Sequence, residues 1–332
     1  MPHLCKAMSS PEKLLSLENL CVHFPVRGGV FRKAIGACKA VDGVSFYIER
    51  GKTFGLVGES GCGKSTLAKS IVQLIQPTSG TIRYKKQTLD KLDRLDSFRK
   101  SVQMVFQDPA ESLNTRMTVG DIIQEPLEIH KIGLAEKRSQ KVKQLLEQVG
   151  LPSNSVQRYP FEFSGGQRQR IGIARALALK PELLVLDEPV SALDVSVQSQ
   201  ILNLLMSLQH DLGLSYLLIS HDLAVVKHVS DIIAVMYLGK IVEMGSATEI
   251  YSHPMHAYTK ALLSAIPVPD PLVKRKKIII PGDIPSPIDP PPGCAYGHRV
   301  SASKYKKSVE EEITWEKVGQ DHWVLKCPCC VF

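Results

Sequence analysis

Residues 58–66 read Gly-Glu-Ser-Gly-Cys-Gly-Lys-Ser-Thr, and this short pattern limits the possible folds more than any other part of the chain. It matches G-x-x-x-x-G-K-[ST], whose glycines let backbone N–H groups turn toward a phosphate, while the lysine and hydroxyl meet the phosphates and Mg²⁺. The apolar run Thr53–Val57 precedes it, and apolar residues at helical spacing follow over Leu67–Ile75. An ordinary glycine-rich turn does not require that setting, whereas an anion binds well where a loop opens a helix. We therefore predict a nucleoside triphosphate site made by Gly58, Glu59, Ser60, Gly61, Cys62, Gly63, Lys64, Ser65 and Thr66.

Strands and helices alternate after this loop, which is typical of an α/β fold with a mostly parallel sheet covered on both faces. The expected strands are 183–186, 215–219 and 232–236, and the expected helices between them are 197–208 and 223–229. A mostly helical segment from about residue 108 to 179 is predicted to form a lobe of its own, with an amphipathic helical stretch over Asp121–Gly150. Before the loop, strands are expected at Leu14–Phe24 and Val41–Ile48, with a glycine-rich, basic loop over Val26–Lys39.

The apolar strand Leu183–Leu186 ends in two carboxylates, Asp187 and Glu188. A carboxylate at the end of a buried strand suits Mg²⁺, usually through water, so Asp187 is a candidate metal residue beside Ser65. Glu188 is placed to orient or deprotonate an attacking water. Taken alone, this motif could be a solvated acidic turn at the end of a strand. Because a phosphate loop precedes it in the same chain, the two carboxylates are more consistent with nucleotide hydrolysis.

Three further features add to this site. Gln107 follows the expected strand Val102–Phe106 and would reach Mg²⁺ or the water, whereas the alternative is a turn residue. His221 follows the expected strand 215–219 and would contact the γ-phosphate, whereas the alternative is a surface or capping histidine. Ser164-Gly165-Gly166-Gln167 precedes a helix and is either a simple helix cap or an anion-binding helix start.

Together, in order and spacing, these motifs resemble an ATP-binding-cassette (ABC) ATPase. The resemblance identifies Walker A at 58–66, the Q-loop at Gln107, the signature motif at Ser164–Gln167, Walker B at 183–187 with the catalytic residues Glu188, His221 and Gln107, and the D-loop at 191–194. It implies ATP and Mg²⁺ as cofactors, with Mg²⁺ held near Ser65, Gln107 and Asp187. It also implies a two-site dimer, in which Ser164, Gly165, Gly166 and Gln167 serve the nucleotide of the other subunit. Adenine usually stacks on an aromatic residue of the first strand region, for which Phe24 is the first choice and Phe31 the second.

Nearly the whole chain resembles the ATP-binding subunits of bacterial dipeptide and oligopeptide importers. The stretches Lys39–Phe46, Phe106–Pro109 and Phe163–Leu177 carry the resemblance within the cassette, and His256–Leu263 and Gly282–Pro287 carry it outside. The resemblance implies that this chain folds as a P-loop NTPase cassette, which combines a mostly parallel sheet core, an antiparallel β subdomain and a helical lobe. The implied domains are the cassette, 14–266, and a C-terminal extension, 267–332.

The implied function is ATP hydrolysis that energises peptide import, as a translocase. Nickel importers share much of the pattern, so the alternative is the same role in the import of nickel or another solute. A soluble ABC ATPase without a transport role is a second, less favoured alternative. The implied partners are a paralogous ATPase subunit, two transmembrane permease subunits and an external solute-binding protein. The sequence does not identify the solute, because the permease and the binding protein select it.

Composition agrees with a peripheral protein on the cytoplasmic face of the inner membrane. No run of 18 apolar residues is present and the N-terminus lacks the apolar part of a signal peptide, so we expect no membrane span. The net charge of +8 suits polyphosphate or an anionic membrane face. Basic runs with interleaved aromatics are missing from the sequence, so nucleic acid is not an expected partner.

The cysteines of the extension depart from the family pattern. Related importers often carry four there, some of which hold an iron–sulfur cluster, with a second cysteine six residues after a Gly-Cys pair. This chain has Gly293-Cys294, but Val300 fills the second place, and Cys327, Cys329 and Cys330 crowd the end. The spacing favours structural or free thiols over a metal ion or an iron–sulfur cluster.

Overall fold

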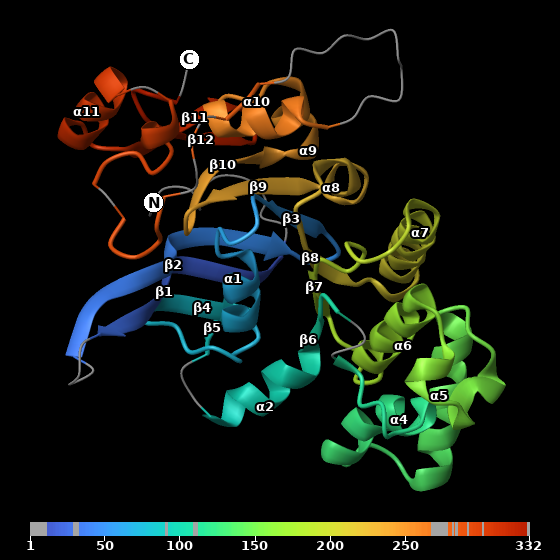
Figure 1. Ribbon diagram of the computed structural model, residues 1–332. Coiled ribbons are helices and arrows are strands. Elements are labelled where there is room, and N and C mark those ends of the chain that lie inside the picture. Colours follow the sequence, from blue (N-terminus) through green and yellow to red (C-terminus); the bar gives the residue numbers. More distant parts are fainter. Residues whose placement is uncertain are drawn as a thin grey trace, which may run out of the picture. The chain divides into compact units, whose positions relative to one another are not determined.

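The computed structural model describes residues 12–28, 33–89, 92–108, 112–266, 278–280, 282, 285–290, 292–300 and 302–330. They form two compact units, each shown as a ribbon in Figure 1. Unit 1 comprises Met1–Glu49, Thr53–Thr88 and Ser220–Phe332, and unit 2 comprises Arg50–Lys52 and Leu89–Ile219.

Unit 1 contains a four-stranded antiparallel sheet in the order β2-β1-β4-β5. Its strands are β1 (Lys13–Gly28), β2 (Lys33–Glu49), β4 (Ser79–Tyr84) and β5 (Gln87–Thr88). The sequence predicts a loop over residues 26–39. This prediction is wrong for the described residues, because Val26 pairs with Gly36 and Pro25 with Ala37. The β1 and β2 strands continue through this glycine-rich stretch because cross-strand pairing, not local composition, decides strand formation.

A second set of strands in unit 1 runs β11-β12-β10-β9-β3. The strands are β3 (Thr53–Val57), β9 (Ile232–Tyr237), β10 (Lys240–Ser246), β11 (Thr314–Gly319) and β12 (His322–Lys326). β3 and β9 are parallel, and the remaining pairs are antiparallel. Leu238 and Gly239 both have positive φ, 44° and 79°, which is the two-residue turn that a tight hairpin requires. The helices of this unit are α1 (Lys64–Ile71), α8 (Leu223–Val229), α9 (Ala247–Ser252), α10 (Ala257–Ser264) and α11 (Ala302–Glu310).

Unit 2 contains three parallel strands in the order β8-β7-β6, namely β6 (Val102–Val105), β7 (Leu183–Asp187) and β8 (Ser215–Ser220). Its helices are α2 (Leu92–Ser101), α4 (Val119–Ile129), α5 (Ala135–Gln148), α6 (Gly165–Leu177) and α7 (Val195–Leu212). Helices α4, α5 and α6, drawn in green in Figure 1, pack on one another. The continuous helical stretch expected over 121–150 is two helices, because Lys131 and Gly133 adopt positive φ between them.

The apolar face predicted for the second of these helices is confirmed, since Val142, Leu145, Leu146 and Val149 are buried. The strands β7 and β8 are buried along their whole length, as expected for a parallel sheet covered on both faces. None of the helices in the described part of the chain has the length and hydrophobicity of a membrane span.

A buried carboxylate joins the C-terminal hairpin to the sheet. Glu243 on β10 is fully buried and accepts hydrogen bonds from His322 Nε2 of β12 at 2.7 Å and from the backbone N–H groups of Met255 and His256 at 2.7 and 3.0 Å. Burial alone would raise the pKa of Glu243, but the hydrogen bonds from His322 and the two N–H groups outweigh it, and the pKa lies below its ordinary value of 4.5.

Because of this hydrogen-bond network, the stability of the folded protein should depend on pH in the acidic range. A carboxyl whose pKa is lower in the folded than in the unfolded state stabilises the fold fully above the unfolded pKa, and this contribution is lost as the pH falls through the folded pKa. The free energy of unfolding should therefore fall below pH 4.5, the ordinary pKa of this group. Glu243→Gln should lose about 1–3 kcal/mol at neutral pH and depend less on acid. Urea titrations followed by circular dichroism test this. Glu316→Gln, which removes an exposed carboxylate on β11, is the control and should match the wild type.

Candidate nucleotide site

The predicted phosphate loop connects β3 to α1 in unit 1. Gly61 and Gly63 have φ of 80° and 108°, a region that favours glycine. A Cβ at Gly58 would lie 2.2 Å from the carbonyl oxygen of Met236, so a side chain is sterically excluded there. Gly63 is the N-cap of α1, and no described side chain caps this helix start. The start of a helix that follows a glycine-rich loop is a favourable place for a bound anion.

The side chain of Lys64 lies inside this loop. It is 4% exposed, and its Nζ donates to the carbonyl oxygens of Gly58 at 2.7 Å and Glu59 at 2.9 Å. The neighbouring Cys62 is also buried, and burial raises the pKa of its thiol despite the positive charge of Lys64. Cys62 therefore stays a neutral thiol that fills space, while Lys64 supplies the charge of the loop.

Two residues far along the chain support the loop, and neither is part of a nucleotide-binding motif of the sequence. The N–H of Glu59 donates to the hydroxyl of Tyr258 on α10 at 2.8 Å. The carboxylate of Glu59 forms an ion pair with Arg299 at 3.0 Å, and Arg299 also donates to the carbonyl of Gly282 at 3.0 Å. Arg299 is 8% exposed, so its guanidinium is held in place largely away from water. The C-terminal extension therefore contacts the phosphate loop directly.

Replacing Arg299 should weaken nucleotide binding although Arg299 is not part of the predicted phosphate site. Without its partner, the Glu59 carboxylate would repel a triphosphate. We expect Arg299→Ala to raise the Kd for ATP roughly 5–30-fold, about 1–2 kcal/mol. Arg299→Lys should lose less, and Glu59→Gln should rescue Arg299→Ala because it removes the unpaired charge. Titration with a fluorescent ATP analogue measures this, and wild-type affinity in Arg299→Ala would contradict it.

The predicted acidic residues lie at the end of β7 in unit 2. Asp187 is 3% exposed, and Glu188 follows it with φ of 46°, a left-handed conformation that is uncommon outside glycine. Such strain is found mainly where a function maintains it. Gln107, which follows β6, donates from Nε2 to Glu188 Oε2 at 3.0 Å. The structure thus brings together two residues that the sequence assigned to the same reaction.

The signature residues begin α6. Ser164 is its N-cap and accepts from the Gln167 N–H at 3.4 Å, while Gln167 Oε1 accepts from the Ser164 N–H at 3.0 Å. The capping alternative noted for this motif is thus realised, yet both side chains remain exposed to a partner. Gly166 has a packing reason as well, because a Cβ there would lie 2.4 Å from the side chain of Val197 on α7.

A cavity of about 140 Å³ lies beside these residues in unit 2. Its lining combines the residues after β6, the first turns of α6 and the segment after β7: Gln107, Asp108, Gly165, Arg168, Gln169, Pro189, Ala192 and Leu193. The Q-loop, signature and D-loop segments, which are distant in sequence, therefore meet around one hollow.

The remaining candidates lie in unit 1. His221 is exposed immediately before Asp222, the N-cap of α8. Phe24 is 41% exposed on β1, paired with Cys38 of β2, so its ring is available for stacking. Phe31, the second choice for adenine, lies outside the described residues.

Two family models match the chain: ABC transporter over residues 41–191, and oligopeptide/dipeptide transporter, C-terminal region, over residues 242–304. The oligopeptide transport ATP-binding protein AppF of Bacillus subtilis is 50% identical over 323 residues, covering 95% of this chain and 97% of that protein. OppF of Salmonella typhimurium is 51% identical, covering 86% and 88%, and the dipeptide transport protein DppF of Escherichia coli is 50% identical, covering 87% and 86%.

Solved structures agree with the fold. CbiO1 of Clostridium perfringens, part of an ABC transporter complex, has a TM-score of 0.62 at 27% identity and covers 73% of this chain and 92% of that one. The ATP-binding cassette MJ0796, described as a dimer in a post-hydrolysis state bound to ADP and Pi, has a TM-score of 0.62 at 26% identity, covering 70% and 98%. The predicted α/β cassette fold is confirmed. With half of its residues identical to a named relative over nearly its full length, the chain belongs to the ATP-hydrolysing, ATP-binding subunits of oligopeptide and dipeptide ABC transporters.

Proposed function

We propose that this chain binds ATP and Mg²⁺ through its phosphate loop and hydrolyses ATP to drive import of di- or oligopeptides. The observation that carries the peptide assignment is the 50% identity to an oligopeptide transport ATP-binding protein, which extends through the C-terminal region. The Gln107–Glu188 hydrogen bond supports hydrolysis. The domain boundaries belong to the same proposal: a cassette of 14–266 with a helical lobe of about 108–179, and an extension of 267–332.

The proposed roles of the site residues follow from their chemistry. Lys64 and the N–H groups of residues 58–66 bind the β- and γ-phosphates, and Ser65, Asp187 and Gln107 hold Mg²⁺ directly or through water. Glu188 accepts the proton of the attacking water, and His221 contacts the γ-phosphate. The adenine ring stacks on Phe24.

A second subunit completes each site in this proposal. The exposed Ser164 and Gln167 at the start of α6 would cover ATP held by the phosphate loop of a paralogous ATPase, giving a heterodimer. Two permease subunits and an external solute-binding protein make up the remaining assembly, and the chain acts as a peripheral subunit at the cytoplasmic face of the inner membrane.

The segment from Asp108 to Glu125 is the proposed docking surface for the permeases. Of its described residues, Asp121 and Glu125 lie on α4 and carry negative charge. Reversing both charges should uncouple transport from hydrolysis while ATP binding stays at the wild-type level.

The test is peptide uptake in a strain from which the gene for this chain has been deleted. The deletion should abolish uptake of a radiolabelled tripeptide, the intact chain should restore it, and Glu188→Gln should not. The intact chain should also co-purify with permease subunits from detergent-solubilised membranes. Loss of nickel uptake with peptide uptake intact would favour the nickel alternative, and normal uptake of both would refute the transport role.

A further inference from the structure

Four cysteines of the C-terminal extension meet in the interior of unit 1. Cys294, Cys327, Cys329 and Cys330 are buried, with exposed fractions of 6%, 2%, 0% and 0%, and all four are free thiols. Cys294 and Cys330 are 36 positions apart in the chain, so folding rather than sequence proximity brings them together. Isolated buried cysteines are common, but four that converge from two separate segments need an explanation.

The sulfur atoms are as close as ligands of one ion. The four sulfurs all lie within 4.8 Å of one another. Sγ of Cys294 is 3.3 Å from that of Cys330, and Cys329 is 2.8 Å from Cys327 and 3.6 Å from Cys330. A tetrahedral zinc site with Zn–S bonds of about 2.3 Å separates its sulfurs by about 3.8 Å. The three sulfur–sulfur distances of 2.8, 3.3 and 3.6 Å are shorter than that value and would widen around the ion.

Hydrogen bonds of the backbone hold the four cysteines in place. The N–H of Cys329 points to the sulfur of Cys327 at 3.4 Å, and the N–H of Cys330 closes a turn onto the carbonyl of Cys327 at 3.2 Å. The carbonyl of Cys330 accepts from the N–H of Ala257, the first residue of α10, at 2.7 Å. On the other side, the N–H of Cys294 donates to Ser308 Oγ of α11 at 3.2 Å. Such outer contacts orient the ligands of a metal site.

We propose that Cys294, Cys327, Cys329 and Cys330 bind one Zn²⁺ ion as a closed tetrathiolate site. Four buried thiolates would repel one another strongly, and a divalent cation removes that repulsion while each sulfur loses its proton. A cluster of several iron and sulfide ions must hold its cysteines further apart than one ion does, and the close spacing here therefore favours a single ion. This assignment is independent of the nucleotide site.

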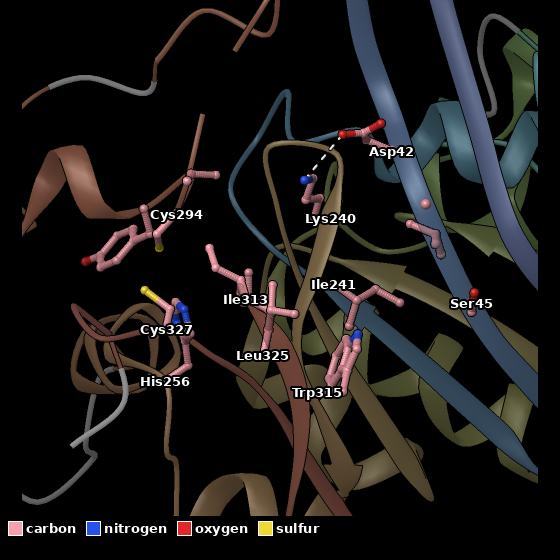
Figure 2. A pocket seen from close by; sticks show the side chains of 16 residues that line it. Asp42, Ser45, Lys240, Ile241, His256, Cys294, Ile313, Trp315, Leu325 and Cys327 are labelled. Carbon is pink, nitrogen blue, oxygen red and sulfur yellow. Dashed lines mark ion pairs between the residues drawn. The ribbon is translucent and has the colours of Figure 1, made fainter. Parts of the chain in front are cut away.

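The cysteines border a cavity. Cys294 and Cys327 line a cavity of about 190 Å³ in unit 1, together with His256, Tyr296 and Trp315. Figure 2 shows Cys294, Cys327 and His256 together at one end of this cavity, away from the ion pair between Lys240 and Asp42. A metal ion or a small chelator would reach the sulfurs from this side.

The ion would tie the two ends of the extension together. Cys294 precedes α11, and the other three cysteines follow β12, so the segment between them forms a loop closed by the metal. Small segments with little core of their own are commonly stabilised in this way. Chelation should therefore loosen α11 and the β11–β12 hairpin first.

The experiment uses the full-length wild-type chain purified under reducing conditions without oxygen. Elemental analysis should find about one zinc per chain, little iron and no acid-labile sulfide, as a closed tetrathiolate requires. Replacing the zinc with Co²⁺ should give the intense visible bands of a tetrahedral cobalt thiolate. Iron and sulfide in equal amounts with a brown colour would overturn the proposal in favour of an iron–sulfur cluster. Four thiols that react with a thiol reagent, without bound metal, would overturn it in favour of simple buried cysteines.

Variants identify the ligands. Cys329→Ser and Cys330→Ser should lower zinc content and lower the temperature at which the extension unfolds, whereas Cys38→Ser, a half-buried thiol on β2, should keep both at wild-type values. Because the variants can fail to fold, the cobalt spectrum of the wild type decides the question on its own. Full zinc content in both cluster variants would refute the assigned ligands.

Discussion

Replacing Glu188 with glutamine is expected to reduce ATP hydrolysis by about 10²–10⁴-fold, the usual contribution of a general base. The amide is close in shape to the carboxylate and can still accept the hydrogen bond from Gln107, so the strained backbone at φ of 46° and the fold should persist. It cannot take a proton from water. Phosphate release under steady-state conditions measures the effect.

The variant should still bind ATP, and hydrolysis should no longer open the dimer. ATP-dependent dimers should then accumulate in size-exclusion chromatography. Glu182→Gln is the matched control because Glu182 lies just before the start of the same strand and pairs with Arg50 on the surface at 2.6 Å. Glu182→Gln should hydrolyse ATP at the wild-type rate, and unchanged turnover in Glu188→Gln would refute the assigned base.

The second large effect is expected from Lys64→Ala. Charge-assisted hydrogen bonds contribute about 1.5–3 kcal/mol each, so loss of the ammonium should raise the Kd for ATP roughly 10–100-fold. Adenosine, which has no phosphate, should bind equally to both proteins. Isothermal titration calorimetry with both ligands separates these outcomes.

Folding needs a check here, because Lys64 also donates to the carbonyls of Gly58 and Glu59. Lys69→Ala, which removes an exposed lysine from the same helix, is the matched control. Equal losses for ATP and adenosine would point to a damaged loop instead of a missing phosphate contact.

Local order along the chain was enough to predict the strands and helices that flank the candidate site motifs. The phosphate loop, the end of β7 and the start of α6 each lie within a few residues, and strand-to-helix order determines what they can do. Gln107 and Glu188 were assigned to one reaction from motif spacing, and the structure places them in hydrogen-bond contact at 3.0 Å.

Features that depend on distant pairing were not predictable from local patterns. The Arg299–Glu59 ion pair joins residues 240 positions apart, and no motif indicates either as the partner of the other. The β1–β2 hairpin extends through glycine-rich sequence because each strand supplies the other's hydrogen bonds. The cysteines were judged by their spacing along the chain, whereas only the fold brings Cys294 beside Cys330.

The pairing of β12 with β10 has one more consequence. Glu243, Met244 and Gly245 of β10 are covered along their open side by Val324, Trp323 and His322. Without the hairpin, that side of β10 would present unsatisfied backbone groups, which readily recruit strands from other molecules. The outermost strand of the described sheet, β11, carries the charges of Glu316 and Lys317 near its centre, and charged edges resist such pairing. The hairpin therefore protects the sheet against self-association, and a fragment cut after Ile266 should aggregate in addition to binding ATP more weakly.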